Sequence, residues 1–222
     1  MIINHTNKFI FFRNNGKNGT TSIENALLKY HEGPSQFVES KDNKDLMHYP
    51  PRYFFLNENN KPLLNYYKFS VVRNPYDWYL SIHRWCIRDN NKSVITDNGY
   101  YEPSEFTPDS PRGSFNAKRV IETFQVINQI DYMWDNQYCG LCFRGRPAVN
   151  TVLRFEHLQK DFNDLMDSLN LPREILEHKR KKRDYDKWKP YDYYYSKDGM
   201  EMVEQICDFD FKVFGYEKES NK

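Results

Sequence analysis

The amino-acid sequence predicts a single-domain α/β fold over residues 1–222, with a parallel sheet flanked by helices. Two observations support this prediction. Short apolar runs alternate three times with stretches of helical periodicity, which is typical of parallel strands joined by crossover helices. The length of 222 residues also suits one domain with a substantial core better than two ordinary domains.

The first strand–loop–helix unit lies within residues 1–30. Residues 8–13 (Lys-Phe-Ile-Phe-Phe-Arg) form an apolar run that ends in turn residues at 14–16, as a buried strand does. A helix is expected over 21–30, because apolar residues recur there on one stripe: Ile23, Ala26, Leu27 and Tyr30. The loop between them therefore joins the carboxyl end of a strand to the amino end of a helix.

Two further units follow the same plan. Residues 67–72 predict a strand, and Pro75 suits the first turn of a helix that runs to about Arg88. Residues 151–155 predict a third strand, which leads into a helix over 156–169. The three strands are thus expected to lie parallel in one sheet.

The remaining segments are placed around this sheet. Residues 89–113 are rich in Asn, Ser, Pro and Gly and are predicted to form an irregular insertion. A helix is expected from Ser114 to about Asn128, and another ends the chain. The run Lys179–Arg183 is basic and is either a loop that closes over a ligand or an ordinary solvated surface.

The overall charge gives no support for a surface that binds nucleic acid or membranes. The formal net charge is +1, with 39% hydrophobic and 28% charged residues. Neither an apolar run of roughly 20 residues nor a secretory leader is visible, so we expect a soluble, cytoplasmic protein. The four cysteines are expected to be reduced, because Cys139 and Cys142 lack a second pair that would complete a zinc site.

The loop after the first strand carries residue types that bind phosphate. Backbone N–H groups at a helix start attract anions, a glycine lets the backbone approach closely, and lysine and hydroxyl side chains supply charge and donors. The candidate ligands are Lys17, Asn18, Gly19, Thr20, Thr21 and Ser22.

This loop has two other interpretations. A kinase-type P-loop places its lysine directly before the hydroxyl residue, whereas Lys17 lies four residues before Thr21. A polar turn in which Thr20 or Thr21 caps the helix explains the same residues without any ligand. The first alternative does not fit the spacing, and the second stays open.

Two motifs resemble those of sulfotransferases that use 3′-phosphoadenosine 5′-phosphosulfate (PAPS). Residues 9–12 and 17–22 resemble the loop that holds the 5′-phosphosulfate, which usually reads Pro-Lys-Thr-Gly-Gly/Ser-Thr-Ser in carbohydrate sulfotransferases. Residues 68–81 resemble the 3′-phosphate motif, with Val-Arg-Asn-Pro-Tyr-Asp in common. Smaller matches lie at 153–162 and 210–216. The similarity is closest to the carbohydrate sulfotransferases, and it implies a P-loop-like sulfotransferase fold.

The sequence also departs from these patterns. Gly16 stands where the family usually has Pro, Asn18 where it has Thr, and Trp78 where Arg is common. Gly16 and Asn18 are acceptable in a loop that works through backbone N–H groups. The departures therefore bear more on the type of acceptor than on binding of the donor.

The resemblance assigns Arg73 and Ser81 to the 3′-phosphate. Arg73 follows a predicted parallel strand, where open α/β sheets bind ligands, and Ser81 lies eight residues on, roughly two helical turns. A strand-end salt bridge between Arg73 and Asp77 and a buried helix serine are the structural alternatives. Gln137 lies where relatives often have Pro-Gln on the acceptor side, although an ordinary helix glutamine explains it equally well.

Two residues are predicted to be catalytic. Lys17 is expected to stabilise the charge that develops on the oxygen bridging phosphorus and sulfur, with simple phosphate binding as the alternative. His48 is the preferred base for the acceptor hydroxyl, because histidine titrates near neutrality and related enzymes often place one here. A structural role beside Tyr49 is its alternative, and Glu24 is the next candidate base.

The sequence as a whole therefore predicts an enzyme that transfers a sulfuryl group from PAPS to a hydroxyl acceptor, releasing 3′-phosphoadenosine 5′-phosphate (PAP). A carbohydrate acceptor is favoured over a small molecule, and no metal, nucleic acid or membrane partner is expected. A nucleotide phosphotransferase, or a non-catalytic member that binds nucleotide or glycan, is the alternative. The acceptor's identity and the oligomeric state stay open.

Overall fold

The structure is a computed structural model that describes residues 1–13, 16–35, 50–88, 107–115, 117, 120, 136–177 and 188–221. Its internal contacts divide the chain into two compact units. The first consists of Met1–Arg73 and Gln137–Lys179, and the second of Asn74–Asn136 and Arg180–Lys222. The chain thus leaves the first unit after Arg73 and returns to it at Gln137.

A four-stranded sheet, in the order β1-β2-β3-β6, forms the centre of the first unit. The strands β2 (Phe9–Phe11), β3 (Tyr67–Val72) and β6 (Thr151–Arg154) are parallel, as the sequence predicts. The edge strand β1 (Ile2–Asn4) was not predicted and pairs antiparallel with β2. A tight turn at residues 5–8 reverses the chain between β1 and β2, with Lys8 at φ 52°.

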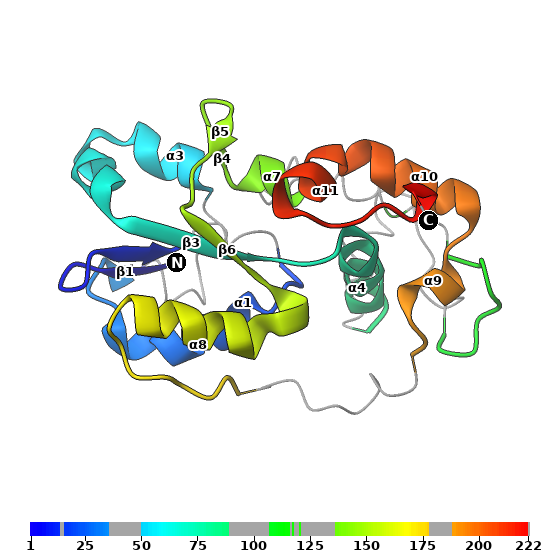
Figure 1. Ribbon diagram of the computed structural model, residues 1–222, viewed down its shortest axis with the longest axis horizontal. Coiled ribbons are helices and arrows are strands. Elements are labelled where there is room, and N and C mark those ends of the chain that lie inside the picture. Colours follow the sequence, from blue (N-terminus) through cyan, green and yellow to red (C-terminus); the bar gives the residue numbers. More distant parts are fainter. Residues whose placement is uncertain are drawn as a thin grey trace. The chain divides into compact units, whose positions relative to one another are not determined.

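Helices cover both faces of this sheet (Figure 1). On one face, α1 (Thr20–Leu27) and α8 (Leu158–Ser168) pack against apolar side chains of β2, β3 and β6. On the other face, α3 (Pro51–Leu56) packs against Ile10 and Phe12, with the small hairpin of β4 (Cys142–Phe143) and β5 (Arg146–Pro147) beside it. The predicted α/β class with a helix-flanked parallel sheet is confirmed.

The second unit is mainly helical among the residues that the structure describes. Its helices are α4 (Pro75–Arg88), α9 (Tyr191–Tyr194), α10 (Lys197–Ile206) and α11 (Asp208–Phe214). Aromatic side chains fill its core, including Trp78 and Tyr79 of α4. The Tyr76 hydroxyl bonds to the buried carboxylate of Glu204 at 2.5 Å, which joins α4 to α10.

The predicted elements match these bounds closely where the structure describes them. The strand at 67–72 agrees to the residue, and the helix predicted from Pro75 to about Arg88 is observed as Pro75–Arg88. The helix expected over 156–169 begins as the 3₁₀ turn Phe155–His157 before α8. Most of the predicted insertion at 89–113 and of the helix at 114–128 lies outside the described residues, and the single-domain prediction stays a prediction.

Two general features concern the described part of the chain. Cys139, Cys142 and Cys207 are thiols rather than disulfide partners. Within the same residues, we find no helix with both the length and the apolar character that a membrane crossing requires.

Candidate functional site

The loop between β2 and α1 places a glycine, not a hydroxyl residue, at the amino end of the helix. Gly19 is the N-cap of α1, in the left-handed region at φ 82°, and no side chain caps the helix. The interpretation of Thr20 or Thr21 as an ordinary N-cap is therefore wrong. The first-turn N–H groups of α1 keep the positive potential that attracts an anion.

Gly19 is also packed against the start of α8. A Cβ atom built on Gly19 would lie 2.8 Å from Cδ2 of Leu158 and 2.9 Å from Cδ2 of Phe155. Both distances are shorter than ordinary van der Waals contact, so any side chain would push the loop away from β6 and α8. Because Gly19 has no side chain, the loop backbone can lie close to Leu158 and Phe155, at the carboxyl end of the sheet.

Gly19→Ala is expected to lower the free energy of unfolding by about 2–4 kcal/mol, measured by urea denaturation. Part of this loss is the left-handed backbone, and part is the contact with Leu158 and Phe155. Gly145→Ala is the matched control, because Gly145 has φ 74° but nothing within 4 Å of an added Cβ. Equal losses in the two variants would contradict the packing argument.

Lys17 adopts a left-handed backbone as well, at φ 76°. A non-glycine residue pays roughly 1–2 kcal/mol for this conformation, and such strain at a ligand loop is consistent with a side chain that is needed there. Its carbonyl oxygen accepts a hydrogen bond from Nη1 of Arg73 at 3.0 Å. The loop after β2 is therefore tied to the residue that follows β3.

The polar side chains of the loop have different partners. Asn18 is fully buried, and its Nδ2 donates to the carbonyl of Val71 at 2.6 Å. Its Oδ1 is buried without a hydrogen-bond partner among the described residues. A buried oxygen of this kind is expected to receive a donor in the functional state.

The hydroxyl groups of the first helical turn are not equivalent. Oγ of Ser22 donates to the carbonyl of Glu177 at 3.0 Å, so its proton is engaged. Oγ1 of Thr21 accepts from Nη2 of Arg13 at 3.1 Å, which leaves the Thr21 proton able to reach a ligand. Thr20 is buried at the first position of α1. Thr21 is thus better suited than Ser22 to donate to an anion.

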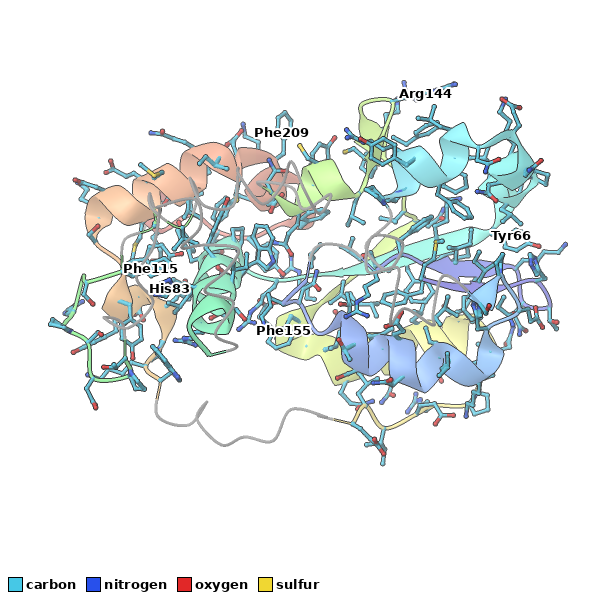
Figure 2. All side chains as sticks on the ribbon, turned by 180° about the vertical axis from the view of Figure 1, so that it is seen from behind. Tyr66, His83, Phe115, Arg144, Phe155 and Phe209 are labelled. Carbon is cyan, nitrogen blue, oxygen red and sulfur yellow. The ribbon has the colours of Figure 1, made fainter. Side chains whose placement is uncertain are left out.

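Arg73 lies directly after β3 and is only 6% exposed. Its guanidinium lies over the ring of Phe155, 4.2 Å from the ring centre. Phe155, labelled in Figure 2, follows β6. Together with the bond to Lys17, this contact fixes the plane of the guanidinium at the carboxyl ends of the parallel strands. A rigid, buried cation at this edge of the sheet is suited to binding an anion.

Gln137 holds the backbone of Arg73 from a distant part of the chain. It opens the short helix α7 (Gln137–Gly140) and is fully buried. Its Oε1 accepts from the N–H of Arg73 at 2.8 Å, and its Nε2 donates to the carbonyl of Arg73 at 2.7 Å. Sequence reasoning placed Gln137 on the acceptor side, and no local signal connects it with Arg73.

A family model described as "Sulfotransferase family" matches residues 1–217, which is nearly the whole chain. The chain belongs to the sulfotransferase family. No curated protein and no solved structure shows a significant match. Membership supports transfer of a sulfuryl group in general, with a sulfonate donor and a hydroxyl-bearing acceptor.

Two of the predicted sulfotransferase residues are not placed at this sheet edge by the structure. Ser81 is buried in α4 and belongs to the second unit, whereas Arg73 is the last residue of the first segment of the first unit. His48 lies outside the described residues, as does the whole basic run 179–183. Their predicted roles stay predictions.

Other ionisable groups that could act as the base have structural engagements. His31 accepts from the Ile3 N–H through Nδ1 at 3.1 Å, and burial lowers its pKa. Burial also lowers the pKa of His83 to about 3. The carboxylate of Glu24 pairs with Arg13 at 2.6 Å. Of the residues described, no three His, Cys, Asp or Glu side chains gather as metal ligands do.

Proposed function

We propose that the chain transfers the sulfuryl group of PAPS to a hydroxyl group of a carbohydrate. The observation that carries this proposal is the bond from Nη1 of Arg73 to the carbonyl of Lys17. It joins Lys17 and Arg73, which follow the neighbouring strands β2 and β3 and are assigned to the two anionic ends of the donor. Membership of the sulfotransferase family supports the reaction type.

The loop after β2 fits the 5′-phosphosulfate end of such a donor. The amino end of α1 has no side-chain cap, so its N–H groups can donate to phosphate oxygens. Gly19 keeps the backbone close to the sheet, and Thr21 retains a proton to donate. Lys17 would add a positive charge, and Asn18 would hold the loop to Val71 of β3.

The 3′-phosphate is proposed to bind Arg73, with Ser81 as a second ligand. The guanidinium is already oriented by Phe155 and Lys17, so little side-chain entropy is lost when an anion binds. A guanidinium can form charge-assisted hydrogen bonds with phosphate oxygens, which is why Arg73 is assigned to this phosphate. The assignment of Ser81 rests on the sequence resemblance.

PAPS supplies an activated sulfuryl group, and the residues of the chain orient it and handle charge and protons. We assign Lys17 to the bridging oxygen, which gains negative charge as the bond to sulfur breaks. His48 is proposed to accept the proton of the acceptor hydroxyl as that oxygen attacks. The reaction is then an in-line transfer in which positioning and charge neutralisation lower the barrier.

Incubation with PAPS labelled in the sulfuryl group and a panel of glycans and small hydroxyl compounds tests this function. We expect labelled product with glycan acceptors and release of PAP in equal amount. Thermal-shift titrations with PAP and ATP distinguish the alternatives. Stabilisation by ATP but not PAP would favour a phosphotransferase, and PAP binding without any product would favour a non-catalytic member.

Arg73→Ala is expected to remove most of the preference for PAP over AMP, which lacks the 3′-phosphate. A lost charge-assisted contact corresponds to about 2–3 kcal/mol, or roughly 30- to 150-fold in the affinity ratio. Calorimetric titration of both nucleotides measures it.

Arg144→Ala is the matched control for Arg73→Ala. The guanidinium of Arg144 also lies over an aromatic ring, that of Phe143, in the turn between β4 and β5 (Figure 2). Arg144→Ala should leave the ratio of PAP affinity to AMP affinity unchanged. Equal affinities for PAP and AMP in the unaltered protein would overturn the proposed donor.

A further inference from the structure

The carboxamide of Gln137 satisfies both backbone polar groups of Arg73, a residue 64 positions away. The parallel ladder between β3 and β6 ends with the pair Val72 and Arg154. Arg73 directly follows this last pair, at the end of β3. Gln137 supplies one donor and one acceptor to its backbone.

The two hydrogen bonds also join the points where the chain leaves the first unit and returns to it. The first segment of this unit ends at Arg73, and its second segment begins at Gln137. Gln137 is fully buried, so its side chain cannot move aside without breaking both buried hydrogen bonds to the Arg73 backbone. The backbone of Arg73 is therefore held from both sides at a fixed place.

A fixed backbone at Arg73 determines where its guanidinium lies. The side chain reaches from this point to the ring of Phe155 and to the carbonyl of Lys17. A shift of the Arg73 backbone by a fraction of an ångström would change both contacts together. Misplacement of a binding group by about 1 Å can cost up to about 10²-fold in a site that depends on orientation.

We propose that Gln137 is a positioning residue that sets the orientation of Arg73 for the 3′-phosphate of the nucleotide. This inference rests on the proposed function, because it assumes that Arg73 reads this phosphate. It differs from a purely structural role. A residue that only links two segments contributes to stability, whereas a positioning residue also determines how well PAP is distinguished from AMP.

Gln137→Met tests the proposal, because methionine keeps the length of the side chain and removes both hydrogen bonds. We expect the ratio of PAP affinity to AMP affinity to fall by about tenfold while AMP affinity changes little. Ser70→Ala is the matched control. Ser70 is fully buried in β3, and its Oγ donates to the carbonyl of Phe12 at 2.7 Å. Ser70→Ala should lower thermal stability without changing the ratio of PAP affinity to AMP affinity.

Gln137→Glu gives a second test, because the glutamate can reproduce the carboxamide only when protonated. Below its pKa the carboxyl group donates to the Arg73 carbonyl and accepts from the Arg73 N–H. Above that pKa the carboxylate repels the carbonyl oxygen of Arg73. The PAP-to-AMP ratio, relative to the unaltered protein at the same pH, should therefore fall by about tenfold as pH rises. Calorimetric titrations across pH measure it.

The outcomes separate this inference from the proposed function. If the unaltered protein binds PAP and AMP equally, the proposed donor and this inference both fail. A large ratio in the unaltered protein that persists in Gln137→Met, with only stability lost, would overturn the role of Gln137 alone. If Gln137→Met does not fold, the pH dependence of Gln137→Glu decides. Failure of both variants to fold at any pH would assign Gln137 a purely structural role and would overturn the proposed positioning role.

Discussion

Lys17→Ala is expected to lower turnover by about 10²–10³-fold while weakening PAP binding much less. The charge on the bridging oxygen develops only as the bond to sulfur breaks, so the ammonium of Lys17 contributes mainly to the transition state. Its strained backbone, at φ 76°, is consistent with a side chain retained for function. Steady-state rates with PAPS and calorimetric binding of PAP measure the two effects.

Lys8→Ala is the matched control for this prediction. Lys8 is an exposed lysine with a positive φ of 52°, in the turn between β1 and β2. Both substitutions place alanine on a left-handed backbone, so they share the conformational cost. Lys8→Ala should leave turnover unchanged. A Lys17→Ala enzyme with normal turnover and only a raised KM would show that Lys17 is a binding residue.

His48→Ala is expected to reduce turnover by roughly 10²–10⁴-fold and to leave PAP affinity intact. A general base works only in its unprotonated form, so the rate of the unaltered enzyme should fall as pH drops through the pKa of His48. This acid limb of the profile should disappear in the variant. The dependence of kcat on pH, measured for both enzymes, provides the test.

His5→Ala is the control for the histidine variant. His5 is exposed in the turn between β1 and β2, where its Nδ1 contacts the hydroxyl of Tyr66 at 2.9 Å. The His5→Ala enzyme should retain full turnover. Near-normal turnover in His48→Ala would exclude His48 as the base. Glu24→Gln would then be the next variant, although the ion pair with Arg13 gives Glu24 a structural role already.

Local patterns in the sequence determined the three parallel strands and the helices that follow them. Each strand is a short apolar run, and each helix repeats apolar residues at helical spacing. The spacing of apolar residues therefore indicates the type of element. The strand Tyr67–Val72 agrees with the structure to the residue, and the helix expected from Pro75 to about Arg88 is present as Pro75–Arg88. The position of the candidate site at the carboxyl ends of these strands follows from the same order.

Local patterns were insufficient where a partner lies far away in the chain. The edge strand Ile2–Asn4 is only three residues long, and its antiparallel pairing depends on the tight turn that follows it. One interpretation of the loop placed Thr20 or Thr21 at the helix start, yet Gly19 is the N-cap, and Leu158 and Phe155 leave no room there for a side chain. Both residues follow a strand that is distant in sequence.

The candidate site combines both kinds of information. The sequence by itself determined that a lysine-containing loop and an arginine follow two parallel strands. Only the tertiary structure decided that Arg73 bonds to Lys17, lies over Phe155 and is held by Gln137. The physical reason is that a buried hydrogen bond depends on the distance and direction of two groups in space, which a short stretch of sequence does not encode.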